Sequence, residues 1–281
     1  MSTGSGSPVR VTGIHLYPLK SAAAFSVQEA AVDRIGLSGD RRWMLVDDEG
    51  RALTQREVPR LARVHAVPAS GGTLEVVALG MPALAIPVPS PAVEPVPTRV
   101  HARVARGLPA GDAAAEWFSE FLETRCRLLY LPSELAIPVA PPWGGASDRT
   151  AFTDGFPVLL IGESSLEELN RRLARPVPMD RFRPNLVVAG SGPFEEDDWN
   201  EVRIGGLRFR AVKPCPRCVV TTVDQLTGVP DPSGEPLATL AGFRKRDGKV
   251  WFGMNLLSEV AGPIRLGDPV QVVSRRGAPA A

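Results

Sequence analysis

The chain has 281 residues, of which 44% are hydrophobic, and 32 Lys and Arg nearly balance 31 Asp and Glu. This length can bury one large core or two modest ones. The net charge of +1 argues against nucleic acid as the main partner, which needs a strongly basic face. No run approaches the roughly 18 apolar residues of a membrane span. The 28 Pro and 27 Gly indicate a protein rich in strands and turns.

The cysteines and the N-terminus bear on location. Cys126, Cys215 and Cys218 are an odd set with one close pair, which favours a reducing compartment over a disulfide framework. Residues 1–8 are small and polar, without an apolar signal region or an Arg-rich amphipathic stretch. We therefore predict no export or transit peptide and a cytoplasmic location.

The first part of the chain is predicted to be mostly strand. Residues 9–17, 26–33 and 43–47 are rich in β-branched and apolar residues, and a Gly-bearing turn precedes the third. The sequence DDEG at 47–50 is a hairpin signal, with RALTQ at 51–55 as a candidate returning strand. Alternating apolar and polar residues between prolines over 73–106 are typical of a small barrel or sandwich.

Helical spacing first appears at 111–124, where Asp112 is a candidate N-cap. Shorter helices are expected at 164–173, with Ser164 or Ser165 near the N-cap, and at 237–243. The remaining expected strands are 127–132, 158–162, 185–190, 201–212, 218–224 and 269–274. The fold class is therefore mostly β with some helix (α+β), with a soft boundary between two halves near 110–130.

The sharpest local feature is KPCPRCVVTTVD at 213–224, with Cys215 and Cys218 at C-x-x-C spacing. A structural zinc site needs two more Cys or His ligands, and none is suitably spaced. A thioredoxin-type motif precedes a helix, whereas Cys218 runs into a β-branched segment expected to be a strand. The remaining alternative is that both thiols are small buried core residues.

The neighbours of the pair favour a thiolate. Lys213 and Arg217 are cationic, and cations stabilise the form that binds soft metals. Pro214 and Pro216 stiffen the segment. A single thiolate on a rigid loop at the start of a strand suits a metal whose other ligands come from an organic cofactor.

Basic residues elsewhere lie on expected turns, where guanidinium forks can bind phosphate oxygens in pairs. Taken singly, each reads as ordinary solvated surface charge; their occurrence together with the cysteine segment favours a phosphate site. The residues in question are Lys20 with Ser21, Arg41 with Arg42, and Arg181, Arg183 and Asn185 in DRFRPN.

The motifs together resemble one family. They are YPLKS at 17–21, GDRRWMLVD at 39–47, FRPN at 182–185, KPCPRCVVTTVD at 213–224, EPLATL at 235–240 and FGMNLL at 252–257. In this order, over about residues 9–273, they resemble the MOSC proteins, named for molybdenum-cofactor sulfurase C-terminal domains. The likeness is to the two-part branch that includes the amidoxime-reducing proteins. It implies an N-terminal MOSC β-barrel domain at 9–122, smaller and packed against a β-barrel MOSC domain at 123–275.

The resemblance implies a molybdenum cofactor, Mo-molybdopterin, with Cys218 as the metal ligand and catalytic thiolate. At Asn255 the animal proteins have a tyrosine, so that contact is altered. The resemblance also implies pyridoxal phosphate binding, as a property of the family's domain in general. The cofactor contacts that the resemblance implies are Lys20, Ser21, Arg41, Asp154, Gly155, Phe156, Arg183, Asn185, Pro216, Arg217 and Asn255.

The implied reaction is reduction of N-hydroxylated small molecules such as amidoximes. Some bacterial relatives carry a C-terminal ferredoxin domain, and this chain has no further cysteines after Cys218. We therefore expect electrons from a separate protein, either ferredoxin-like or a haem carrier. The alternative is a protein that only binds or carries the cofactor, or transfers sulfur to it through a Cys218 persulfide.

Overall fold

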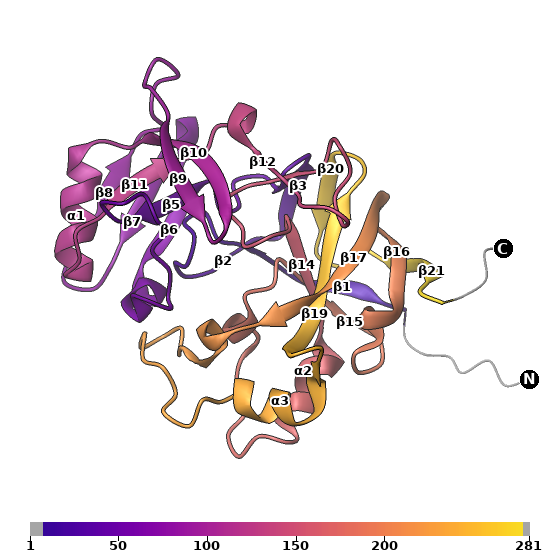
Figure 1. Cartoon of the computed structure of the whole chain (residues 1–281). Helices are drawn as coiled ribbons and strands as arrows, with labels where there is room; N and C mark the ends of the chain where they lie inside the picture. The colour runs from indigo at the N-terminus through magenta and orange to yellow at the C-terminus, as the bar shows by residue number, and fades with distance from the viewer. Residues whose placement is uncertain (1–7, 278–281) are drawn as a thin grey trace, which may run out of the picture.

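The computed structural model describes residues 8–277, and these form a mostly β protein with three α-helices. Figure 1 shows two units side by side, a smaller one built from the first half of the chain and a larger one built mainly from the second half. The expected fold class, mostly β with some helix, is confirmed.

The larger unit is organised by one long sheet in the order β2-β1-β15-β14-β19-β17-β16-β21, with β18 added beside β19. Its strand pairs are antiparallel except for β14 with β15. The bounds of the strands are β1 Arg10–Leu16, β2 Phe25–Ser26, β14 Val158–Gly162, β15 Leu186–Ala189, β16 Trp199–Ile204, β17 Leu207–Arg217, β18 Lys245–Arg246, β19 Lys249–Ser258 and β21 Val270–Arg275.

This sheet curls until its ends meet. The Val270 amide donates to the Val9 carbonyl at 2.8 Å, and the Val11 amide donates to the Asp268 carbonyl at 2.9 Å. The curled sheet encloses an apolar core that includes Trp199 and Phe209, both fully buried. A small sheet of β20 (Gly262–Arg265), β3 (Glu29–Asp33) and β4 (Gly36–Leu37) adds to this core. Closing a sheet removes the exposed edges that invite aggregation.

The smaller unit contains two sheets and a helix. One sheet has the order β5-β11-β10-β9 and the other has the order β6-β7-β8. Helix α1 (Asp112–Leu122) packs Trp117, Phe118 and Phe121 into their shared core. The strands are β5 Trp43–Val46, β6 His65–Pro68, β7 Leu74–Val77, β8 Leu84–Ile86, β9 Val96–Val100, β10 Arg103–Pro109 and β11 Arg127–Tyr130, and a short pair, β12 Ile137–Pro138 with β13 Arg149–Thr150, follows.

The first strands cross between the units. β1 pairs with β15, with Arg10 opposite Ala189, and β3 pairs with β20, so residues 10–37 contribute to the core of the larger unit (Figure 1). The first strands therefore belong to the core of the larger unit, although they precede the smaller unit in the chain. This crossover matters for function because the chain leaving β1 carries Lys20 and Ser21 to the junction between the units.

Several local expectations need correction. Residues 218–224 are not a strand: β17 ends at Arg217, and a 3-10 turn, Val219–Thr222, follows. The Thr221 hydroxyl donates to the Cys218 carbonyl at 2.9 Å, which stabilises the turn against the β-branched preference for strand. The expected strand at 51–55 is reduced to two isolated bridges, Ala52 with Val46 and Arg51 with Arg99.

The helix starts also differ in detail. Gly111, not Asp112, occupies the N-cap of α1, and Asp112 is the first helical residue, where its charge favours the helix dipole. Helix α2 spans Glu163–Asn170 with Gly162 at its N-cap, so neither Ser164 nor Ser165 caps it. Helix α3 spans Leu237–Arg244, close to the expected 237–243.

Glu196 is a buried carboxyl that fixes the start of α2. It accepts hydrogen bonds from the Ser165 hydroxyl at 2.8 Å and the Gly162 amide at 3.1 Å. Burial raises the pKa of Glu196 above its ordinary value, although these donors oppose the shift. The folded protein therefore binds this proton more readily than the unfolded chain does.

We expect this group to make stability depend on pH. Its contribution is fully present below the ordinary Glu pKa and is lost as pH rises through the raised pKa of the folded state, at about 1.4 kcal/mol per pH unit within that window. Urea unfolding of the wild type and of Glu196→Gln across pH 4–8 measures the difference. As pH rises, the unfolding free energy of the wild type should fall relative to that of Glu196→Gln. Unfolding free energies that change with pH in parallel in the two proteins would contradict the raised pKa of Glu196.

Candidate functional site

A cavity of about 410 Å³ lies where the two units meet, and chain segments from both of them line it. The smaller unit contributes the segment after β5 and the start of β10. The larger unit contributes the segments before β14 and β15, the last residues of β17 and one residue of β19. The chain after β1 and the turn before β5 complete the lining with Lys20, Ser21 and Arg41.

Cys218 and all the cofactor contacts that the family resemblance implies line this one cavity. They are Lys20, Ser21, Arg41, Asp154, Gly155, Phe156, Arg183, Asn185, Pro216, Arg217, Cys218 and Asn255. Arg42 and Arg181, which the sequence also suggested, turn away: Arg42 bonds to the Leu131 carbonyl, and Arg181 pairs with Asp224. The roles of the lining residues stay predictions, while their common location is a property of the structure.

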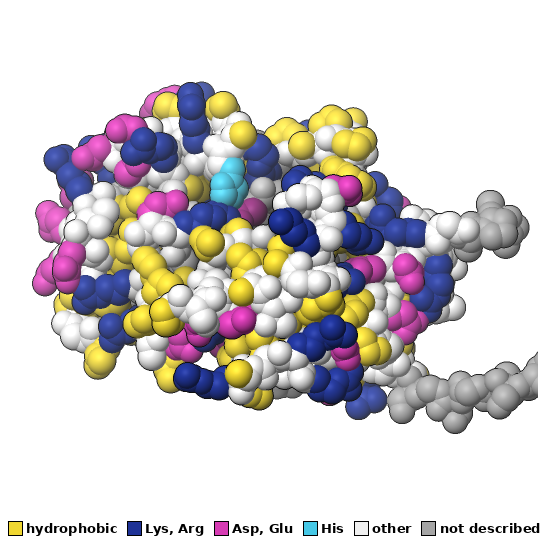
Figure 2. Space-filling view, turned by 60° about the horizontal axis from the view of Figure 1, so that its bottom comes forward, with side chains coloured by type: hydrophobic (Ala, Val, Ile, Leu, Met, Phe, Trp, Pro, Cys, Tyr) yellow, Lys and Arg dark blue, Asp and Glu magenta, His cyan; other side chains and the backbone are white. Residues whose placement is uncertain are grey.

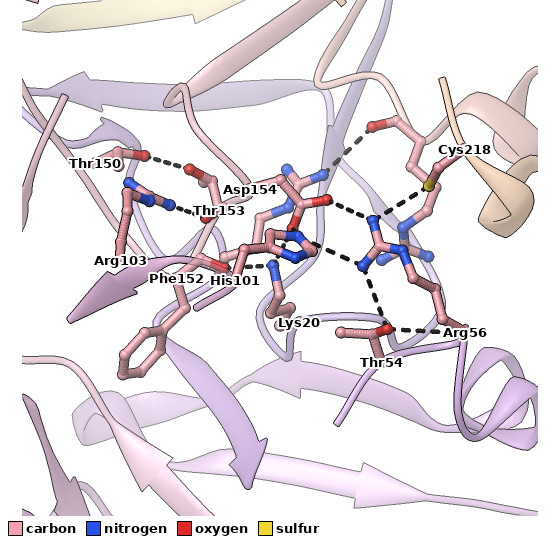
Figure 3. A network of polar contacts seen from close by, with 12 residues as sticks. Lys20, Thr54, Arg56, His101, Arg103, Thr150, Phe152, Thr153, Asp154 and Cys218 are labelled. Carbon is pink, nitrogen blue, oxygen red and sulfur yellow. Dashed lines mark hydrogen bonds and ion pairs between the residues drawn. The ribbon is translucent and has the colours of Figure 1, made fainter. Parts of the chain in front are cut away.

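The thiol of Cys218 is held beside a guanidinium that the sequence reasoning missed. Arg56 Nη2 lies 3.2 Å from Cys218 Sγ and 3.3 Å from Asp154 Oδ2 (Figure 3). Burial would lower the pKa of Arg56, but the Cys218 and Asp154 charges raise it. Arg56 lies in the polar sequence LTQRE, just after the expected hairpin. Its position as a cation on a turn beside apolar strands was the one sequence feature that could have suggested a place in the site.

The cations expected beside Cys218 have other partners. Arg217 Nη1 contacts Cys215 Sγ at 3.1 Å, and Lys213 Nζ lies over the Trp143 ring at 5.3 Å from its centroid. Cys218 also stands at the end of a strand rather than at the start of one. The two thiols therefore have separate guanidinium partners, and it is Arg56 that contacts Cys218.

Asp154 connects the two sides of the cavity. Lys20 forms an ion pair with it and donates to the Phe152 carbonyl at 2.9 Å, and His101 Nε2 lies 3.1 Å from Asp154 Oδ1 (Figure 3). The side chain of Asp154 is 57% exposed. Partial desolvation would raise its pKa, yet Lys20 and His101 hold that pKa well below the ordinary range. Burial lowers the pKa of Lys20, and Asp154 opposes that shift.

The buried ring of Tyr17 contacts two guanidinium groups that line the cavity. Arg41 and Arg183 stack over its ring at 4.2 and 4.3 Å from the centroid. Burial raises the pKa of Tyr17 to about 12, so it stays neutral and acts as a stacking platform. Asn185 braces the group: its Oδ1 accepts from Arg41 at 3.1 Å, and its Nδ2 donates to the His15 carbonyl at 3.1 Å.

Some buried donors in the cavity have no partner within residues 8–277. Arg183 Nη2, Arg217 Nε and two guanidinium nitrogens of Arg103 are in this state. Burial lowers the pKa of Arg183 to about 10, which leaves it charged at neutral pH. Burying such cations without an anion is costly, so a negatively charged group bound among them would be stabilised.

The charged residues that line the cavity are mostly positive. Asp154 is the one acidic residue among the described residues that line it. The Lys and Arg residues in the lining are Lys20, Arg41, Arg56, Arg103, Arg183, Lys213 and Arg217. By contrast, the face in Figure 2 mixes Lys and Arg with acidic and apolar side chains and shows no continuous basic patch. This concentration fits a phosphate-bearing ligand.

Several of these residues have a left-handed backbone. Ser21, Arg41, Arg183 and His101 all have positive φ, between 46° and 66°. Non-glycine residues adopt this conformation rarely and at a cost, and such strain concentrates at functional sites. Gly155 lacks a side chain at a point where a Cβ would meet no atom within 4 Å, which leaves room beside Asp154.

A metal at Cys218 would need ligands beyond those the chain offers. Within residues 8–277 no three His, Cys, Asp or Glu side chains gather into a group that could hold a metal ion. A single thiolate beside a cationic cavity suits a metal already held by an anionic organic ligand.

None of the helices in the described part of the chain is long and apolar enough to cross a membrane.

Fold and site together define a two-unit β protein in which a cysteine thiol and seven cationic side chains line one cavity between the units. Comparison with known families agrees: residues 8–125 match the MOSC N-terminal beta barrel domain, and residues 147–271 match the MOSC domain. The chain belongs to the MOSC family, in the branch that combines these two domains.

Curated relatives extend the likeness over most of the chain. Mitochondrial amidoxime-reducing component 1 of Mus musculus is 36% identical over 282 residues, which covers 94% of this chain and 82% of the relative. The protein of the same name from Homo sapiens is 34% identical, covering 94% and 83%. Among solved structures, the YuaD protein from Bacillus subtilis is 10% identical and covers 93% of both chains at a TM-score of 0.43, a likeness too weak to add to the argument.

Arg183 provides a test of the cationic end of the cavity. Losing one charge-assisted contact to phosphate should cost about 1.5–3 kcal/mol, or roughly a ten- to hundredfold loss of cofactor affinity. We expect Arg183→Gln to be purified with much less pterin than the wild type. Arg42→Gln is the matched control, because Arg42 lies outside the cavity and should leave pterin content unchanged. Equal pterin content in the two variants would show that Arg183 does not contribute to cofactor binding.

Proposed function

We propose that this protein is a molybdenum-cofactor-dependent reductase of N-hydroxylated compounds. The observation that carries the proposal is the cavity in which Cys218 faces a set of cations that includes buried, unpartnered guanidinium nitrogens. The relatives named amidoxime-reducing components support the choice of reaction.

The residues fit the cofactor in chemical terms. Arg183, Lys20 and Arg41 would hold the pterin phosphate, and Cys218 would ligate molybdenum as a thiolate. When bound, the cofactor supplies two-electron redox chemistry. Reduction of an amidoxime consumes two electrons and two protons and releases an amidine and water.

The chain's own groups then have defined tasks. Arg56 Nη2 lies 3.2 Å from the Cys218 sulfur, so it would donate a hydrogen bond to that atom and fix its position at the metal site. Lys20 and His101 keep Asp154 ionised, so a carboxylate always faces the Cys218 end of the cavity. Such a group can orient an amidine-like substrate through charge-assisted hydrogen bonds.

An assay with a chemical electron donor tests the proposal. Protein purified from molybdenum-replete cells should reduce benzamidoxime to benzamidine with reduced methyl viologen, and protein from molybdenum-depleted cells should not. Cofactor-loaded protein with no turnover of any N-hydroxylated compound would favour the alternative, a cofactor carrier or a sulfur-transfer protein that uses a Cys218 persulfide.

A further inference from the structure

A second cavity, of about 270 Å³, lies beside the main one and shares Lys20, Thr54 and Arg56 with it. Arg56 lines both cavities, and its guanidinium contacts Cys218 Sγ at 3.2 Å. A group bound in the second cavity would therefore be close to the end of the main cavity at which the metal ligand is expected.

The second cavity is also positively charged. Besides Lys20 and Arg56 it is lined by Arg51, Arg99 and His101. Its one carboxylate among the described lining residues belongs to Glu57, and that group is already engaged. Glu57 accepts hydrogen bonds from the amide of Thr54 at 3.0 Å and from its hydroxyl at 2.7 Å.

Two of its arginines are fixed side by side. Arg51 and Arg99 form a parallel bridge, in which the Ala52 amide donates to the Arg99 carbonyl at 3.0 Å and the Arg99 amide donates to the Gly50 carbonyl at 2.9 Å. Arg51 pairs with Asp47 at 2.7 Å and Glu49 at 2.6 Å. Within residues 8–277, Arg99 has no carboxylate at ion-pair distance.

Because Asp47 and Glu49 already compensate the charge of Arg51, Arg99 is the arginine of this pair that remains available to an added anion. The concave shape favours a small ligand over a flat protein surface. Arginine forks are well suited to the planar carboxylate group, which they can bind with two parallel hydrogen bonds.

We propose that the second cavity is an anion subsite that binds a carboxylate carried by the substrate while the N-hydroxyl group lies at the Cys218 end of the main cavity. The inference rests on the proposed function and narrows its substrate class to N-hydroxylated compounds with an acidic group. Arg99 binds the carboxylate, and Arg56 lies between the two groups of the substrate.

A pair of isosteric substrates tests the subsite. The ratio of kcat/KM for 4-carboxybenzamidoxime to that for the neutral 4-carbamoylbenzamidoxime is measured at low ionic strength with reduced methyl viologen as donor. Because the site is partly exposed, we expect a preference of about fivefold for the carboxylate in the wild type, falling as salt is added. In Arg99→Gln the ratio should fall to near parity.

The control is Arg203→Gln, which removes an exposed arginine from β16, on the side of the larger unit away from the smaller one (Figure 1). It should keep the wild-type ratio. Calorimetric titration with the product, 4-carboxybenzamidine, should show the same loss of affinity in Arg99→Gln, which gives a readout independent of turnover.

Each other outcome has a distinct meaning. A ratio near one in the wild type, or an unchanged ratio in Arg99→Gln, would overturn the subsite while leaving the proposed reductase intact. Lower pterin content in Arg99→Gln, with equal losses on both substrates, would overturn it by assigning the second cavity to the cofactor phosphate. Failure of the loaded wild type to reduce either substrate would instead contradict the proposed function.

Discussion

Replacement of Cys218 with serine should remove bound molybdenum and N-hydroxy reduction together. Serine is a poor ligand for a metal that prefers thiolate, and the Arg56 contact cannot substitute for the lost sulfur. We expect activity to fall by at least about a hundredfold, as for other groups whose loss removes the reacting centre. Metal analysis and the benzamidoxime assay measure the two effects on the same preparation.

Cys215→Ser is the matched control for this change. Cys215 lines the same cavity three residues away, but its thiol is paired with Arg217 rather than with Arg56. This variant should retain most of the molybdenum and most of the activity. Wild-type molybdenum and activity in Cys218→Ser would refute the ligand assignment, and the reverse pattern would move it to Cys215.

Activity should also depend strongly on which electron donor is supplied. We expect the loaded protein to show no benzamidoxime reduction with NADH or NADPH alone. The sequence has no nicotinamide-type G-x-G-x-x-G loop and no cysteine cluster beyond the Cys215–Cys218 pair. We therefore expect electrons from a pyridine nucleotide to reach a metal at Cys218 only through a separate carrier protein.

Activity should appear when a carrier is supplied. A reduced ferredoxin-like or haem protein, or a chemical reductant, should restore turnover from background to a readily measured rate. The decisive comparison uses one preparation with NADH alone, with NADH plus a reductase and carrier, and with reduced methyl viologen. Turnover with NADH alone would show that the chain contains a second redox site.

Much of the site was predictable because its residues lie in short, chemically distinctive segments. Lys20, Arg41, Arg183 and Cys218 each stand on a turn or at a strand end, and all line one cavity. Arg56 and His101 were missed, since a single cation or histidine on a turn carries no local signal of its partner. Their importance follows from contacts with Asp154, about 50 to 100 residues away in the chain.

The strand-rich fold class also followed from local pattern, whereas the pairing of the first strands with the larger unit did not. The pairing of Arg10 with Ala189 joins residues far apart in sequence, and alternation of apolar residues gives no information about which strand is the partner. After Cys218 the local pattern itself was misleading, because the β-branched residues predicted a strand where the chain forms a turn. There the Thr221 and Thr222 hydroxyls, which donate to the carbonyls three residues earlier, stabilise a 3-10 turn.

If the cavity at the junction of the two units holds a molybdenum–pterin cofactor, the purified protein should contain it. We expect molybdenum and pterin analysis of wild-type protein, purified without chelators from molybdenum-replete cells, to give equimolar molybdenum, pterin and protein. The metal should be lost in Cys218→Ser, and the pterin should be much reduced in Arg183→Gln. Wild-type protein that is folded and free of both molybdenum and pterin would contradict this expectation.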